Sequence, residues 1–158
     1  MTVDKQIVTF FGVGYTPIAP GTAGALVGGI LFYLLSLALT NYGLDFYTIQ
    51  IILILITIAV MLIGVRSIGK VENKWKHDAQ QIVIDEVVGV WIAMLFIPIT
   101  WFNFLLAFVL FRIFDITKPL FIRKLDQLKS SWSIMLDDVV AGVYANLVLQ
   151  LYLYLNIY

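Results

Sequence analysis

Five acidic side chains stand out as candidates for chemistry because they recur beside apolar segments of the 158-residue chain. They are Asp85, Glu86, Asp115, Asp137 and Asp138. The first and last are 53 positions apart (138 − 85), so only folding could gather them. Gathered carboxylates repel one another unless cations offset their charge, and their oxygens suit Mg²⁺. The five acids therefore predict a metal site. A set of helix caps and surface ion pairs is the alternative interpretation.

A second candidate is the Gly- and Pro-rich stretch FGVGYTPIAPGTAGAL, from Phe11 to Leu26. Gly14 and Gly21 free the backbone, and Thr22 is a suitable cap for a helix that follows. A Gly-rich turn that leads into a helix N-terminus presents amide hydrogens to an anion. The stretch predicts either a phosphate-binding loop or a structural turn, and the pattern alone leaves both open.

Several other catalytic solutions are excluded by what the chain lacks. It has no cysteine, which excludes disulfides, thiolate metal sites and cysteine nucleophiles. His77 is its only histidine, whereas lipid phosphatases of the acid phosphatase type need two. No D-x-D pair of the kind used by aspartyl-phosphate enzymes occurs. The carboxylates are therefore the main catalytic candidates.

The composition shows where these acids must sit. Hydrophobic residues make up 61% of the chain, charged residues only 13%, and the mean hydropathy is +0.97. This exceeds the apolar fraction of soluble domains, so part of the surface must face lipid. The net charge is zero, which gives no reason to expect nucleic acid as a partner. We expect residues 1–158 to form a single membrane-embedded domain.

Apolar runs longer than barrel strands predict an all-α integral membrane protein with about five transmembrane helices. The candidate spans are Ala23–Leu39, Thr48–Val65, Val83–Ile97, Phe102–Phe114 and Val139–Tyr158. With five spans, the acids all lie at the same end of their helices. Pro98 and the outer loops lie at the opposite end. Gly89 and Gly142 each follow an acid by four residues and so share its helix face, which predicts close helix approach there.

Basic residues predict the orientation. One precedes the first span, four follow the second, one lies near the end of the fourth and four follow it, and the opposite loops have none. They are Lys5; Arg66, Lys70, Lys74 and Lys76; and Arg112, Lys118, Arg123, Lys124 and Lys129. This asymmetry places the N-terminus, the two long loops and the acids on the cytoplasmic side.

Those long loops carry apolar residues at helical spacing. Val71 and Trp75 are four apart, and Phe121, Leu125 and Leu128 repeat among basic residues. We expect short amphipathic interfacial helices at the cytoplasmic surface, with solvated basic loops as an equal alternative.

Three blocks of sequence together resemble the phosphatidylglycerophosphatase A family. They are GVGYTPIAPGT (Gly12–Thr22), HDAQQIVIDEVVG (His77–Gly89), and FRIFDITKP (Phe111–Pro119) with MLDDVVAG (Met135–Gly142). Their order and spacing span nearly the whole chain. The chain departs from the family pattern at Ala79 and Phe121, where the family commonly has proline, and both positions are in loops.

The resemblance implies a Mg²⁺-dependent enzyme of the bacterial cytoplasmic (inner) membrane. Members of the family remove the terminal phosphate of phosphatidylglycerophosphate, a phospholipid of the bilayer, to give phosphatidylglycerol. The metal ligands implied are Asp85, Glu86, Asp115, Asp137 and Asp138, and the catalytic acids are Asp85, Glu86, Asp115 and Asp138. The phosphate would contact Gly14, Gly21, Thr22, Arg112 and Lys118. The active site would face the cytoplasm.

A small transporter or channel subunit whose acids bind cations is the alternative function. That class would favour acids near the membrane midplane, whereas the acids here are predicted at one end of the spans.

Overall fold

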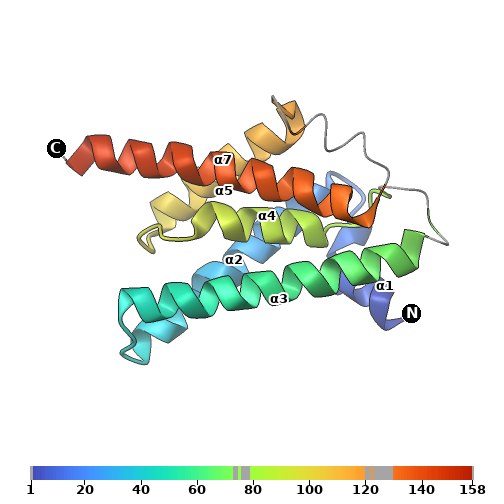
Figure 1. Ribbon diagram of the computed structural model, residues 1–158, viewed down its shortest axis with the longest axis horizontal. Coiled ribbons are helices and arrows are strands. Elements are labelled where there is room, and N and C mark those ends of the chain that lie inside the picture. Colours follow the sequence, from blue (N-terminus) through green and yellow to red (C-terminus); the bar gives the residue numbers. More distant parts are fainter. Residues whose placement is uncertain (1, 73–74, 76–78, 120–121, 123–129, 158) are drawn as a thin grey trace.

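The computed structural model describes residues 2–72, 75, 79–119, 122 and 130–157 of the chain. Within them the fold is all-α, as predicted, with six α-helices and one short 3₁₀ turn (Figure 1). The elements are α1 (Val3–Val8), η1 (Val13–Tyr15), α2 (Pro20–Asn41), α3 (Phe46–Glu72), α4 (Ile84–Met94), α5 (Trp101–Thr117) and α7 (Ser131–Ile157). The short helix α1 was not expected.

Three helices, α2, α3 and α7, are long and apolar enough to cross a membrane. In each of these helices, less than half of the apolar 18-residue stretch is buried inside the protein. The rest presents large apolar side chains outward, such as Leu55 on α3 and Leu147 on α7, which are 62% and 59% exposed. Exposure of so broad an apolar surface to water is unfavourable, and these helices therefore face lipid.

The fourth helix is shorter than the span Val83–Ile97 predicted for it. α4 has 11 residues, about 16 Å of helix at 1.5 Å per residue, against a hydrocarbon core of about 30 Å. α5 has 17 residues. Three of the five predicted segments thus form helices long enough to cross a membrane, whereas α4 and α5 are shorter than the 18 residues required.

α4 forms the core of the bundle and packs against α2, α3, α5 and α7. Nearly all of its residues are buried. On one side Gly28 of α2 lies against Val87, and the Trp91 indole donates a 2.7 Å hydrogen bond to the Gly28 carbonyl. α4 is therefore enclosed by other helices rather than by lipid.

The C-terminal end of α4 is satisfied by side chains from neighbouring helices. The Asn146 amide of α7 donates to the carbonyls of Ala93 and Leu95, at 3.1 and 2.7 Å. The Gln50 side chain of α3 accepts from the Phe96 amide at 2.7 Å. These contacts satisfy the backbone groups at the end of α4, which lies four residues before Pro98.

Figure 1 shows the end of α3 and the starts of α4 and α7 at the same end of the bundle as the N-terminus. The C-terminus lies at the opposite end. At the N-terminal end, the Asp4 carboxylate accepts a 2.9 Å hydrogen bond from Lys70 and so joins α1 to α3. The Lys5 ammonium lies 5.2 Å from the centre of the Trp75 ring.

Two helix boundaries differ from those predicted. α7 begins at Ser131, so Asp137 and Asp138 lie well inside the helix instead of at its start. α3 continues to Glu72, so Arg66, Lys70 and the buried Val71 belong to it and not to a separate amphipathic helix. The second amphipathic helix predicted, around Phe121, Leu125 and Leu128, lies outside the described residues.

Candidate metal centre

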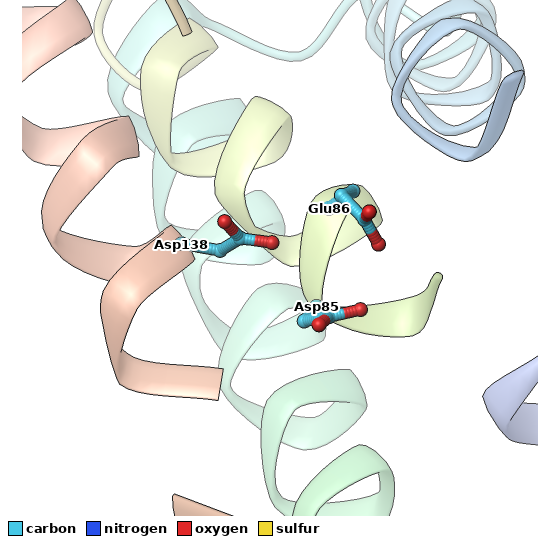
Figure 2. A group of neighbouring side chains, drawn as sticks. All are labelled: Asp85, Glu86 and Asp138. Atoms are coloured by element: carbon cyan, nitrogen blue, oxygen red, sulfur yellow. The ribbon is translucent and has the colours of Figure 1, made fainter. Parts of the chain in front are cut away.

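Three carboxylates gather where the first turn of α4 meets α7. Asp85 and Glu86 come from α4 and Asp138 from α7 (Figure 2). Each offers a ligand oxygen, and these oxygens all lie within 4.8 Å of one another. Asp85 and Asp138 are only 5% and 4% exposed. We call these three residues the carboxylate trio.

The trio depends on a close crossing of two helices. At Gly142 of α7, a side chain would run into the backbone carbonyl of Gly89 on α4. At Gly89, a β-carbon would come within 2.9 Å of the Asp138 carbonyl. Because each glycine follows its acid by one helical turn, this backbone contact sets the spacing of the acids. The predicted role of these two glycines in close helix approach is confirmed.

The start of α4 is fixed from the other side. The Val83 amide donates a 2.8 Å hydrogen bond to the Val8 carbonyl at the end of α1. Asp85 and Glu86 then fall in the first helical turn, where the helix dipole favours negative charge. The helix end thus offsets part of the cost of burying these acids.

The other two predicted acids are engaged in ion pairs beside the trio. Asp115 pairs with Arg112 at 2.5 Å, one turn earlier on α5. Asp137 pairs with Lys118 at 2.8 Å. The charge of Asp115 still acts on both Glu86 and Asp138. The five acids therefore divide into a trio and two flanking pairs, where the sequence alone had suggested one group.

The trio fits a hard divalent cation. Two buried and one partly buried carboxylate within one ligand sphere repel one another unless a cation offsets their charge, and oxygen donors suit such ions. Glu86 Oε2 is buried and, within the described part of the chain, accepts no hydrogen bond. A bound cation would satisfy this oxygen and reduce the repulsion. The donor set alone does not distinguish Mg²⁺ from other hard divalent ions.

The Gly- and Pro-rich stretch reaches the trio at one residue. A β-carbon at Gly21 would collide with the Glu86 carboxylate and lie 3.6 Å from Arg112 Nη1. The absence of a side chain at Gly21 lets the first turn of α2 rest directly on Glu86. This places two of the predicted phosphate-contact residues, Gly21 and Arg112, beside the same carboxylate.

The structure places Gly14 and Thr22, the other two phosphate-contact residues predicted in this stretch, in different surroundings. Gly14 is buried against the backbone carbonyl of Gln81, so it serves close packing. It borders a polar cavity of about 230 Å³ that Gln80 and Thr16 also line. Thr22 does not cap α2, because Ala19 precedes the helix with φ 48° and Pro20 is its first residue. Thr22 lies in the first turn and faces α5.

The apolar groove that Thr22 borders was not predicted from the sequence. Val109, Ile113 and Ile116 line this groove on the α5 side, next to Arg112. Their spacing of four and three residues would have assigned them to one face of a helix. His77, Asp78 and Phe121 lie outside the described residues, while Ala79 is partly buried and packs against the core.

Comparison with known proteins gives a consistent result. The family model described as Phosphatidylglycerophosphatase A matches residues 6–153. A protein of Bacteroides thetaiotaomicron named "Putative phosphatidylinositol-3-phosphatase" is 43% identical over 142 residues, covering 88% of this chain and 86% of that protein. Phosphatidylglycerophosphatase A of Haemophilus influenzae is 39% identical, covering 87% and 81%. That of Escherichia coli is 36% identical, covering 84% and 73%. No solved structure matches the chain.

Proposed function

This chain belongs to the phosphatidylglycerophosphatase A family, and on that premise we propose that it converts phosphatidylglycerophosphate into phosphatidylglycerol and phosphate. The resemblance seen in its motifs is confirmed, and the protein is a membrane lipid phosphatase with bacterial relatives. The transporter alternative has no support from its relatives. The observation that carries the proposal is the carboxylate trio, because its oxygens lie within reach of one ion.

We propose Mg²⁺ as the ion, held by Asp85, Glu86 and Asp138. Bound there, it would supply the charge neutralisation that a phosphate monoester needs before an anionic site can accept it. Asp115 and Asp137, each held by a basic partner, would orient those partners. They would also be available to a second ion.

Arg112 is suited to hold the phosphate. Its Nη1 pairs with Asp115, while its Nε is buried without a hydrogen-bond partner in the described part of the chain. A guanidinium fixed through one nitrogen can still donate to a phosphate oxygen through another. Lys118 would add a second positive charge, and the first turn of α2 at Gly21 a close backbone surface.

The chemical step requires little covalent work from the protein. The oxygen of a water molecule bonds to phosphorus, and the bond from phosphorus to the glycerol oxygen breaks. A carboxylate of the site accepts the proton of the water, and the released glycerol oxygen gains a proton. The chain would align the water, hold the phosphate and provide the proton acceptor.

We further propose that residues 1–158 form one domain with five membrane crossings, α4 and α5 included. The short helix α4 would cross the bilayer together with the residues that follow it, because side chains of α3 and α7 bond to their backbone groups. The Gln50 side chain, for example, accepts from the Phe96 amide. The distribution of basic residues supports a position of the carboxylate trio at the cytoplasmic side of a bacterial inner membrane.

A second substrate is favoured by one relative. The Bacteroides thetaiotaomicron protein, 43% identical, is named for phosphatidylinositol 3-phosphate. Both substrates are phosphate monoesters on the head group of an anionic phospholipid, so the trio would serve either. The difference would lie in the part of the site that contacts the glycerol or inositol.

The test is phosphate release by the purified protein in detergent micelles. Phosphatidylglycerophosphate and phosphatidylinositol 3-phosphate are offered separately, each with Mg²⁺ and with excess chelator. We expect kcat/KM to be at least ~10-fold higher for phosphatidylglycerophosphate, with phosphate release only when Mg²⁺ is present. A preference for the inositol lipid would assign the second substrate, and no release from either would refute the proposed activity.

A further inference from the structure

An open groove of about 390 Å³ lies between the first turn of α2 and one face of α5. Thr22 borders it on the α2 side. On the α5 side it is lined by Val109, Ile113 and Ile116, with Arg112 between them. Apart from Thr22, Arg112 and Thr117, its lining is apolar.

The groove opens outward. Val109, Ile113 and Ile116 are 48%, 49% and 69% exposed. They belong to α5, whose other exposed residues are also apolar apart from Thr117 at its end, so in a membrane the opening faces lipid tails. An occupant of this groove would arrive sideways, from within the bilayer.

The groove meets the carboxylate trio at Arg112. Arg112 lines the groove and also lies 3.6 Å from the β-carbon position of Gly21, which itself rests on Glu86. A molecule in the groove would therefore lie along an apolar wall and beside a guanidinium that adjoins the acids. An anionic phospholipid likewise joins an apolar chain to an anionic head.

We infer that this groove holds an acyl chain of the phospholipid substrate, which enters laterally between α2 and α5 with its phosphates toward Arg112. The inference rests on the proposed function and adds the route and orientation of the substrate. It makes Val109 and Ile113 positioning residues for the lipid, not catalytic residues.

The absence of cysteine in the chain permits a test in which the groove is blocked after folding. Ile113→Cys is purified and then modified with a bulky maleimide. Val148→Cys, on the outward face of α7 and 41% exposed in the native chain, is the matched control. Activity is measured on phosphatidylglycerophosphate and on its deacylated, water-soluble form, before and after modification.

We expect modification at Ile113→Cys to lower kcat/KM for the lipid at least ~10-fold and to leave the deacylated substrate within about twofold. Modification at Val148→Cys should change neither. Equal loss on both substrates at Ile113→Cys, or no loss on the lipid, would overturn the inference.

A binding experiment separates this inference from the proposed activity, because it needs no turnover. A benzophenone maleimide is placed at Ile113→Cys or Val148→Cys and irradiated with phosphatidylglycerophosphate radiolabelled in an acyl chain. Crosslinking at Ile113→Cys should be several-fold stronger and should fall with excess unlabelled phosphatidylglycerophosphate but not with phosphatidylcholine. Equal labelling at the two positions, or equal competition by both lipids, would show that the groove is filled by bulk lipid only.

Discussion

The backbone carbonyl of Gly89 occupies the space where a side chain at Gly142 would stand. This contact between α4 and α7 lies one helical turn beyond Asp85 and Asp138. The spacing of two of the three acids of the carboxylate trio depends on it. The geometry of the proposed metal centre therefore depends on residue 142 being a glycine, which has no side chain.

Replacing that glycine should weaken the site without touching an acid. We expect Gly142→Ala to push α7 from α4 and to lower kcat/KM at least ~10-fold, about 1.4 kcal/mol of transition-state stabilisation. Gly69→Ala on α3 is the control, because the added carbon there meets only the Ser131 side chain, with its hydroxyl at 3.0 Å. Phosphate release and thermal unfolding are measured for both variants. Unchanged activity in a folded Gly142→Ala would show that the crossing does not control the site.

Much of this site could be predicted because acids and glycines leave local signals. Gly89 follows Asp85 by four residues, and Gly142 follows Asp138 by four. This spacing alone assigned each acid and its glycine to the same helix face. The boundaries of α4 and α7 could not be predicted in this way. α4 ends where Asn146 and Gln50, distant in sequence, satisfy its last carbonyls and the following amide. α7 starts seven residues before Asp138, within sequence too polar to be recognised as part of a span.

The division of the five acids into the carboxylate trio and two ion-paired acids could not be predicted from the sequence either. Arg112 lies three residues before Asp115, so that ion pair was available from helical spacing. Lys118 directly follows α5 and Asp137 lies within α7, 19 residues further on, and only the fold brings them to 2.8 Å. The apolar groove depends on α2 and α5 together, which explains why neither segment indicated it alone.

Metal removal should abolish activity and lower stability. Without a cation the trio repels an anionic phosphate, and we expect excess chelator to stop phosphate release and Mg²⁺ to restore it. Because an ion that binds only the folded protein stabilises it, Mg²⁺ should also raise the unfolding temperature of the native chain but not of Asp138→Asn. Full turnover in excess chelator would contradict the metal assignment.

Arg112 should be sensitive even to a change that keeps its charge. Arg112→Lys removes the planar fork that can bind Asp115 and a phosphate oxygen together, and we expect at least a ~10-fold loss of kcat/KM. Arg66→Lys, an exposed position on α3, should have no effect. The ion pair with Asp115 is partly replaceable by lysine, so folding should survive. Equal activity of the two variants would argue against a phosphate contact by Arg112.

The five-crossing topology predicts which residues each side of the membrane can reach. Ser130 and Asn41 are both exposed at helix ends, and the proposed topology places them on opposite sides. A single cysteine at Ser130 should react with a membrane-impermeant maleimide only after the cytoplasmic side is opened. One at Asn41 should react in intact cells. Labelling of both from the same side would overturn the count of five.

The central claim is that the carboxylate trio carries out the hydrolysis, and neutral isosteres test it most directly. Asp85→Asn and Asp138→Asn keep side-chain size and remove the charge that would bind the metal. Asp45→Asn is the control, because Asp45 lies in the loop between α2 and α3, where it caps α3 through hydrogen bonds from Thr48 of 3.1 and 2.6 Å. All three variants are compared with the native chain for phosphate release from phosphatidylglycerophosphate at saturating Mg²⁺, alongside their thermal unfolding.

We predict that Asp85→Asn and Asp138→Asn each remain folded and lose at least ~100-fold in kcat/KM, roughly 2.7 kcal/mol of transition-state stabilisation, while Asp45→Asn keeps full activity. A folded and fully active variant at Asp85 or Asp138 would contradict the account, because it would reduce the buried carboxylates to structural groups.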